Sequence, residues 1–238
     1  FDFNYDPTDT CPLWINFLDE TFENDQEVIQ ILREAFKWTV LPKDNSQHFP
    51  LEYFFDLFGE KGCGKVTIQE VLTAVFRGNK ARGLLRSNNI GSPATRVSLI
   101  GKKLAINPDA SGRMTDAGVF NSIVSNEPVE IKVLYEDNSS ERLGIVVWRN
   151  FYDQPSVSRG GTEGLGRRIV TFRIKNRPAR PDTELKGKLL EEVSGIFQWC
   201  WSMSEVDMKE TLERRIEEKA IAEASVENQL EHQQVLRF

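Results

Sequence analysis

A glycine-rich segment that follows an apolar run limits the fold of this chain more than any other feature. The run LEYFFDLF at 51–58 reads as a buried strand, and apolar residues spaced as on one helix face follow the segment, at Ile68, Val71, Leu72 and Val75. A strand, a glycine-rich loop and a helix in this order are typical of a phosphate-binding loop. The nucleotide-binding residues predicted from this pattern are Gly59, Glu60, Lys61, Gly62, Cys63, Gly64, Lys65, Val66 and Thr67.

The chemistry of this loop follows from its residues. The glycines let backbone N–H groups turn toward a phosphate, and the helix N-terminus adds partial positive charge. Lys65 can reach the β- and γ-phosphates of ATP. Val66 stands where a Ser or Thr normally binds Mg²⁺, so we expect the metal to be held through water or by Thr67. A chance glycine turn, or a loop that binds poorly, is the alternative interpretation.

The rest of the chain predicts an α/β fold with helices at both ends. Strands are expected at 99–106, 145–148 and 169–174, and a hairpin at 129–135 and 142–148 around the polar loop 136–141. Helices are expected within 1–48, at 67–76, at 186–201 and at 205–232. The charged last helix reads as a partner-binding or a solvated face. We expect a helical segment at 1–48, a motor at 49–201 and a C-terminal helix at 202–238.

Composition narrows the class of protein. A hydrophobic content of 39% in 238 residues allows one good core. The net charge is −6, yet residues 71–108 carry seven basic and no acidic residues, which favours a local phosphate-binding surface over a merely solvated one. Three scattered cysteines and two histidines make a zinc site unlikely and favour a reducing cytoplasm. No apolar run is long enough to span a bilayer, and no signal peptide is visible.

The order of these segments resembles the superfamily-three (AAA+) helicases, in particular the primase-helicases of poxviruses, phages and plasmids. The opening YDPTDTCPLWINFLDETFENDQEVIQILREAFKWTV is similar to the helical segment before the motor, and ELKGKLLEEVSGIFQWCW is similar to the closing helix. The resemblance covers residues 5–201. It implies an AAA+ core with a central parallel sheet, which hydrolyses ATP with Mg²⁺ between the subunits of a hexameric ring and unwinds DNA.

The same resemblance implies roles for residues outside the loop. In GKKLAINPD, Leu104–Ile106 is similar to the Walker B strand. Asp109 stands where the family usually has its catalytic Glu, and it could help to hold Mg²⁺. In IVVWRNFYDQP, Asn150 is similar to the sensor that orients the attacking water. In GTEGLGRRIVTF, Arg167 and Arg168 resemble the arginine finger from a neighbouring subunit. Each residue also has a purely structural interpretation. Asp109 could belong to a polar turn after a strand, Asn150 could cap the end of a strand, and the two arginines could be a surface pair.

The predicted hairpin resembles the DNA-gripping hairpin of these rings, with Lys132 and Tyr135 as candidate contacts to single-stranded DNA. Because the chain begins at Phe1 and the family often carries an upstream primase-polymerase, we expect this chain to be one domain of a longer protein. Two rivals are a small nucleotide kinase, suggested by a P-loop without the hydroxyl residue, and a catalytically weak DNA-binding assembly module.

Overall fold

A parallel β-sheet lies between two groups of helices in the computed structural model, which describes residues 3–43, 49, 51–76, 82–85, 90–110, 116–135, 137–152, 168–178 and 182–214. Its strands have the order β2-β3-β6-β1-β7 and all of its described pairs are parallel. The strands are β1 (Phe54–Phe58), β2 (Arg82–Leu84), β3 (Leu104–Asn107), β6 (Val146–Phe151) and β7 (Ile169–Arg173). The predicted α/β fold with a central parallel sheet is therefore confirmed.

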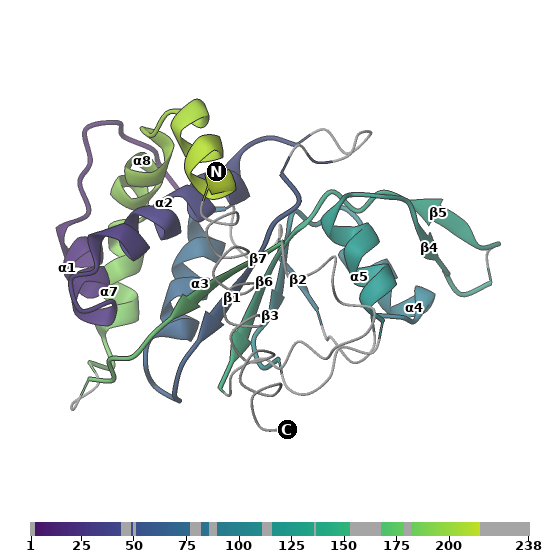
Figure 1. Cartoon of the computed structure of the whole chain (residues 1–238), viewed down its shortest axis with the longest axis horizontal. Helices are drawn as coiled ribbons and strands as arrows, with labels where there is room; N and C mark the ends of the chain where they lie inside the picture. Colours follow the sequence, from purple (N-terminus) through teal and green to yellow (C-terminus); the bar gives the residue numbers. More distant parts are fainter. Residues whose placement is uncertain are drawn as a thin grey trace, which may run out of the picture.

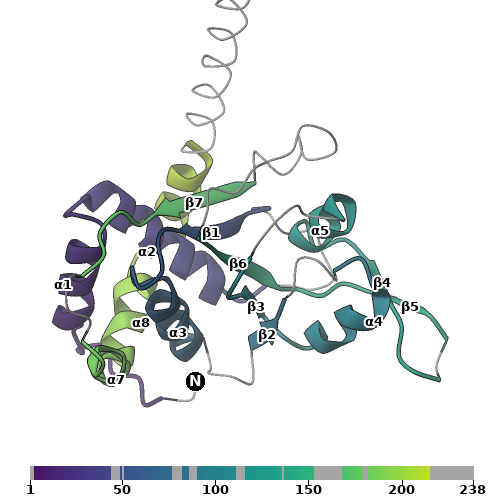
Figure 2. The same cartoon turned by 90° about the horizontal axis from the view of Figure 1, so that it is seen from below.

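Helices cover both faces of this sheet (Figures 1 and 2). On one side lie α1 (Pro12–Thr21), α2 (Gln26–Val40), α3 (Lys65–Val75), α7 (Leu185–Glu191) and α8 (Val193–Trp201). On the other side lie α4 (Pro93–Arg96), η2 (Val97–Leu99), α5 (Ala117–Val124) and the hairpin of β4 (Val129–Ile131) and β5 (Ser139–Glu141). None of the described helices is long and apolar enough to cross a membrane.

Alternating side chains of the strands point to opposite faces of the sheet and belong to two hydrophobic cores. Phe55 and Leu57 of β1 pack with the helices α1, α2, α3 and α8, whereas Phe54 packs with Phe120 of α5. Successive side chains of a strand point to opposite faces, so a sheet covered on both sides needs apolar residues at nearly every position. This requirement explains why the run at 51–58 lacks a polar alternation.

A buried ion pair interrupts the second core. Asp56 of β1 and Arg149 of β6 are register partners, and the guanidinium makes two hydrogen bonds to the carboxylate, of 2.8 and 2.6 Å. The guanidinium also lies 4.7 Å from the centre of the Phe54 ring. A buried charge pair is tolerated only when its hydrogen bonds are satisfied in this way. The pair therefore aligns β1 with β6, the two strands that lead to the phosphate loop and to Asn150.

A glutamate joins the first helix to the last ones. The Glu192 carboxylate accepts hydrogen bonds from the backbone N–H groups of Leu13 and Trp14, at 3.1 and 2.9 Å. These N–H groups have no partner within α1, and a negative charge at a helix N-terminus is favourable. Close packing reinforces the junction, because a Cβ atom at Gly195 would lie 2.2 Å from the Thr10 carbonyl oxygen. The N-terminal and C-terminal helices thus form one layer.

The structure corrects several predicted boundaries. The helix after the loop begins at Lys65 rather than Thr67, and the strand expected at 99–106 begins at Leu104, because 97–99 form a 3₁₀ turn that buries Leu99. The helix expected at 186–201 is two helices that meet at Glu192. Helical residues also run from 205 to 214, and the rest of the helix predicted to 232 lies outside the described residues.

The predicted hairpin is present but pairs differently. β4 pairs with Ser139–Glu141, not with residues 142–148. The buried run within 142–148 instead begins β6, the central strand of the sheet, which agrees with the strand predicted at 145–148. Residues 139–141 are all exposed, so their hydrophobic pattern could not reveal a strand.

Candidate functional site

The phosphate loop lies at the carboxyl end of β1, at an edge where open parallel sheets bind their ligands. Two of its glycines are required by space and backbone angle. A Cβ atom at Gly59 would lie 2.5 Å from the carbonyl oxygen of Ile174, and Gly64 has φ of 105° and packs against the Phe17 ring. Gly64 also caps α3, whose N-terminus opens at Lys65. The loop geometry therefore fits the predicted phosphate site.

The side chain of Lys65 is buried and folds back onto the phosphate loop. It is 3% exposed, and its Nζ donates hydrogen bonds to the carbonyl oxygens of Gly59 and Glu60. The ammonium also lies 4.6 Å from the centre of the Tyr152 ring, a favourable cation–π contact. These contacts hold the positive charge beside the helix N-terminus, so both attract an anion at the same place.

A cavity of about 590 Å³ opens beside the loop. The loop residues from Lys61 to Thr67 form one wall, and Leu13 and Phe17 of α1 form another. Pro178 and Leu185, from the segment after β7 and from α7, complete the apolar part. A cavity of this size, with apolar walls and a few polar groups, is typical of a site for a small molecule.

Val66 and the predicted magnesium ligand Thr67 both line the cavity but carry different side chains. Val66 is 54% exposed and lines the cavity with two methyl groups, which cannot bind a metal. Thr67 lines the same wall and carries the hydroxyl. Oxygen donors are the ligands that Mg²⁺ prefers, so Thr67 fits the metal and Val66 does not. No group of three or more His, Cys, Asp or Glu side chains that could hold a metal occurs in the described ranges.

The predicted catalytic residue Asp109 follows β3, and the predicted Asn150 lies near the carboxyl end of the neighbouring strand β6. The backbone N–H of Ala110 donates to the Asn150 carbonyl oxygen at 2.8 Å, which brings the turn that contains Asp109 beside β6. Asp109 is exposed, whereas Asn150 is fully buried in β6. β6 also lies next to β1 and pairs Asn150 with Leu57, just before the loop. The structure therefore brings both residues to the edge that carries Lys65.

Arg168 of the predicted finger is not at this edge. Arg168 precedes β7, and its carbonyl oxygen accepts from the N–H of Phe54, at the start of β1. Its guanidinium pairs with Glu52 and donates to Asn121 at 2.9 Å. Arg168 thus lies at the end of the sheet away from the loop of its own chain. Arg167 lies outside the described residues.

The candidate DNA contacts lie on the hairpin, on the other side of the sheet from α1 (Figure 1). Lys132 directly follows β4 and is exposed. Tyr135 is 97% exposed and Leu134 is 75% exposed, in the loop between β4 and β5. Tyr135 has a positive φ of 65°, which places it in a tight turn. The structure thus places both predicted residues away from the phosphate loop and leaves both side chains exposed.

Two residues beside Lys65 and Asn150 were not predicted from the sequence. Tyr152 covers the ammonium of Lys65, and Gln69 of α3 accepts a hydrogen bond from Asn150. Gln69 follows Lys65 by one helical turn, and residues four apart share a helix face. That spacing could have indicated Gln69, whereas no local pattern indicates Tyr152.

Comparison with known proteins gives a likeness in fold. No protein-family model and no curated protein sequence matches the chain. Among solved structures, the A form apo structure of the NrS-1 C-terminal region is similar, with a TM-score of 0.67 and 14% identity over 90% of this chain. A second apo structure of this region (305–718) gives a TM-score of 0.66 and 15% identity over 91% of this chain. This chain spans about half of those chains, 53% in both cases, and at this identity the likeness shows a shared fold.

Proposed function

We propose that this chain is the nucleotide-binding motor domain of a ring-forming DNA helicase of the superfamily-three type. The main observation behind this proposal is that the Gly59–Thr67 loop and Asn150 lie at the same carboxyl edge of one parallel sheet. The fold shared with the NrS-1 C-terminal region supports it. Hydrolysis of ATP would take place at this edge, between neighbouring subunits of a ring that is proposed to be a hexamer.

Each residue of the edge has a distinct task in this proposal. Lys65 binds the β- and γ-phosphates, and its charge offsets the charge that develops during transfer. Asn150 orients the attacking water, and the Asp109 carboxylate accepts its proton. Thr67 and Asp109 would hold Mg²⁺, which would neutralise phosphate charge when bound. Positioning of this kind supplies most of the acceleration in phosphoryl transfer.

The hairpin gives the proposed motor a contact to single-stranded DNA. Tyr135 offers an exposed aromatic ring on which a base can stack, and Lys132 offers a charge for a backbone phosphate. Neither contact reads sequence, which suits a protein that moves along DNA. The two sites lie on different sides of the sheet, so movement of α5 and the hairpin relative to the loop would couple them.

The test is ATP hydrolysis by the purified protein, with and without single-stranded DNA. Lys65→Ala is expected to lower turnover by at least about 100-fold, because the phosphate charge then lacks its main partner. Lys188→Ala, which removes an exposed lysine of α7, is the matched control and should leave turnover unchanged. Unchanged turnover in Lys65→Ala would refute the assignment.

The same samples separate the rival functions. A nucleotide kinase would transfer phosphate to a nucleoside monophosphate and would stay monomeric with ATP. A catalytically weak assembly module would bind DNA without hydrolysing ATP. The proposal requires release of inorganic phosphate that rises with single-stranded DNA.

A further inference from the structure

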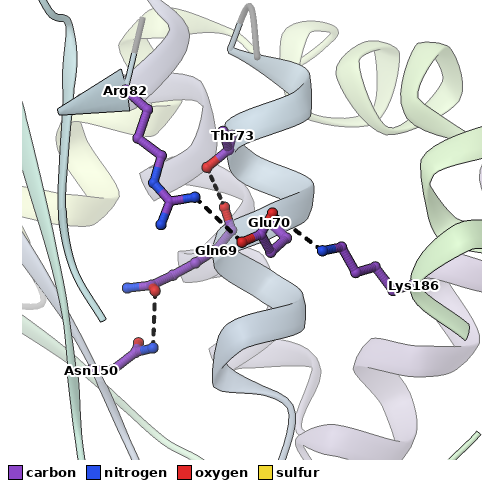
Figure 3. Close-up of polar contacts among 6 residues, drawn as sticks. All are labelled: Gln69, Glu70, Thr73, Arg82, Asn150 and Lys186. Carbon is purple, nitrogen blue, oxygen red and sulfur yellow. Dashed lines mark hydrogen bonds and ion pairs between the residues drawn. The ribbon is translucent and has the colours of Figure 1, made fainter. Parts of the chain in front are cut away.

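The amide of Gln69 meets the amide of Asn150 between α3 and β6 (Figure 3). Asn150 Nδ2 donates to Gln69 Oε1 at 2.9 Å. Both side chains are buried, Gln69 with 2% exposed and Asn150 with none. Gln69 stands one turn after Lys65 on the helix that the phosphate loop opens. A single hydrogen bond thus connects the helix of the phosphate loop to the proposed sensor.

Each amide has a second polar atom that is left over. Asn150 Oδ1 and Gln69 Nε2 have no hydrogen-bond partner within the described residues, and Figure 3 shows both on the same side of the pair. One is an acceptor and the other a donor. Turning both amides over would keep the bond between them and would again leave one donor and one acceptor. The pair therefore complements a molecule that donates and accepts at once, as water does.

A sensor asparagine needs a partner of this kind. The last torsion of an Asn side chain has a broad, two-fold preference, so the side chain alone does not fix which atom faces a ligand. A buried amide beside Asn150 holds one end of the Asn150 amide by a hydrogen bond, so the other end is held toward the free side of the pair. Gln69 supplies that amide from α3, the helix that begins at the phosphate loop.

We propose that Gln69 is a positioning residue, which holds the amide of Asn150 so that its free polar atom faces the water that attacks the γ-phosphate. The inference rests on the proposed function and adds a residue to it. Gln69 acts through Asn150, so its loss slows the chemical step and leaves the grip of Lys65 on the phosphates intact.

The next residue of the same helix provides a matched control. Glu70 has an exposed side-chain fraction of 28% and points away from Asn150, as Figure 3 shows. Its carboxylate pairs with Arg82 at 3.3 Å and with Lys186 at 3.5 Å, which links α3 to β2 and α7. Partly exposed ion pairs of this kind contribute little to stability. Glu70→Gln thus alters a polar contact of α3 outside the proposed water site.

Three substitutions of Gln69 test the proposal by steady-state ATP hydrolysis and by binding of a non-hydrolysable ATP analogue. Gln69→Met removes the acceptor, and Gln69→Asn keeps the amide but is one methylene too short to reach Asn150. Both should lower kcat by about tenfold or more, with KM and analogue affinity within about threefold of wild type. Gln69→Glu keeps an acceptor for Nδ2 and should recover most of kcat, and Glu70→Gln should match wild type.

The outcomes separate this inference from the function on which it rests. A wild-type protein that does not hydrolyse ATP would overturn both. If wild type is active, Lys65→Ala is inactive and Gln69→Asn has a normal kcat, only the inference fails. A fall in kcat of Glu70→Gln equal to that of Gln69→Asn would also overturn it, because the effect would then be a general disturbance of α3. If Gln69→Met does not fold, the comparison of Gln69→Asn with wild type is sufficient to test the inference.

Discussion

Glu34 is a buried carboxylate in the layer of N-terminal and C-terminal helices. It is 1% exposed on α2, and its Oε2 has no hydrogen-bond partner in the part of the chain that is described. Burial raises the pKa of Glu34 to about 7, although hydrogen bonds from Gln30 and Thr211 and the charges of Arg214 and Arg33 oppose the rise. Loss of water is therefore the dominant effect on this group.

This pKa predicts how stability changes with pH. The folded state binds the Glu34 proton more tightly than the unfolded state, whose pKa is near 4.5, so the free energy of unfolding falls as pH rises from about 4.5 to about 7. Glu34→Gln removes this cost and should be more stable than wild type by about 1–3 kcal/mol at pH 8, with little difference at pH 4.5. Urea denaturation at both pH values measures it, and a difference independent of pH would contradict the prediction.

At the scale of single residues, the loop was predictable and the buried polar partners were not. Gly59–Thr67 is a contiguous pattern, and its roles follow from neighbours in sequence. Asn150 could be identified by resemblance, but its partner Gln69 lies 81 residues away. Likewise, Arg168 reads as a free cation in sequence, and only the fold shows that Glu52 neutralises it.

Among the elements, buried strands were easier to predict than exposed ones. β1 and β6 are apolar runs, because a strand covered on both faces must be apolar at nearly every position. β5 is the exposed Ser139–Glu141 and carries no such pattern. β2 and α5 were not predicted, since three residues are too few for periodicity and α5 is short. The hairpin was thus expected in the right place with the wrong second strand.

The hairpin carries a prediction about DNA. Tyr135→Ala should weaken binding of a labelled single-stranded oligonucleotide by about 5-fold or more, because stacking on an aromatic ring contributes about 1–3 kcal/mol per base. Lys132→Ala should lower the slope of log affinity against log salt by about 1, as expected for one lost phosphate contact. Fluorescence anisotropy at several salt concentrations measures both.

Lys188→Ala is the control for charge in this experiment. It removes a partly exposed lysine of α7, a helix on the other side of the sheet from the hairpin. ATP-analogue binding should stay unchanged in all three variants. If Tyr135→Ala binds the oligonucleotide as tightly as wild type, the tip of the hairpin does not contact the DNA and this prediction is wrong.

For the molecule as a whole, the sequence predicted the alternation of strands and helices but not how the two ends meet. The layer of α1, α2, α7 and α8 depends on contacts between residues more than 160 apart, such as Lys37 Nζ with the Trp201 carbonyl oxygen at 2.8 Å. Local periodicity contains no information on such pairs. This contact between the two ends shapes the candidate site, because α1 and α7 both line the cavity beside the phosphate loop.

The position of Arg168 leads to the prediction for the assembled protein. Arg168 directly precedes β7, at the end of the sheet away from the phosphate loop, so in the proposed ring Arg168 would serve the loop of another subunit. Arg168 also pairs with Glu52, so Arg168→Ala should lower stability as well as activity. Arg167→Ala is also expected to lower activity, and thermal unfolding of both variants separates a loss of activity from a loss of stability.

Mixing inactive subunits tests whether the site is shared. In a ring with fingers in trans, an interface between an Arg167→Ala subunit and a Lys65→Ala subunit can present an intact Lys65 to an intact finger. Mixtures should therefore recover part of the ATP hydrolysis that each variant lacks alone, with a maximum near equal amounts. A subunit that supplied both groups to its own site would give no recovery at any ratio, since every subunit in the mixture carries one defect. Light scattering with ATP on the same mixtures shows whether subunits associate, so a lack of recovery in assembled rings would count directly against the shared site.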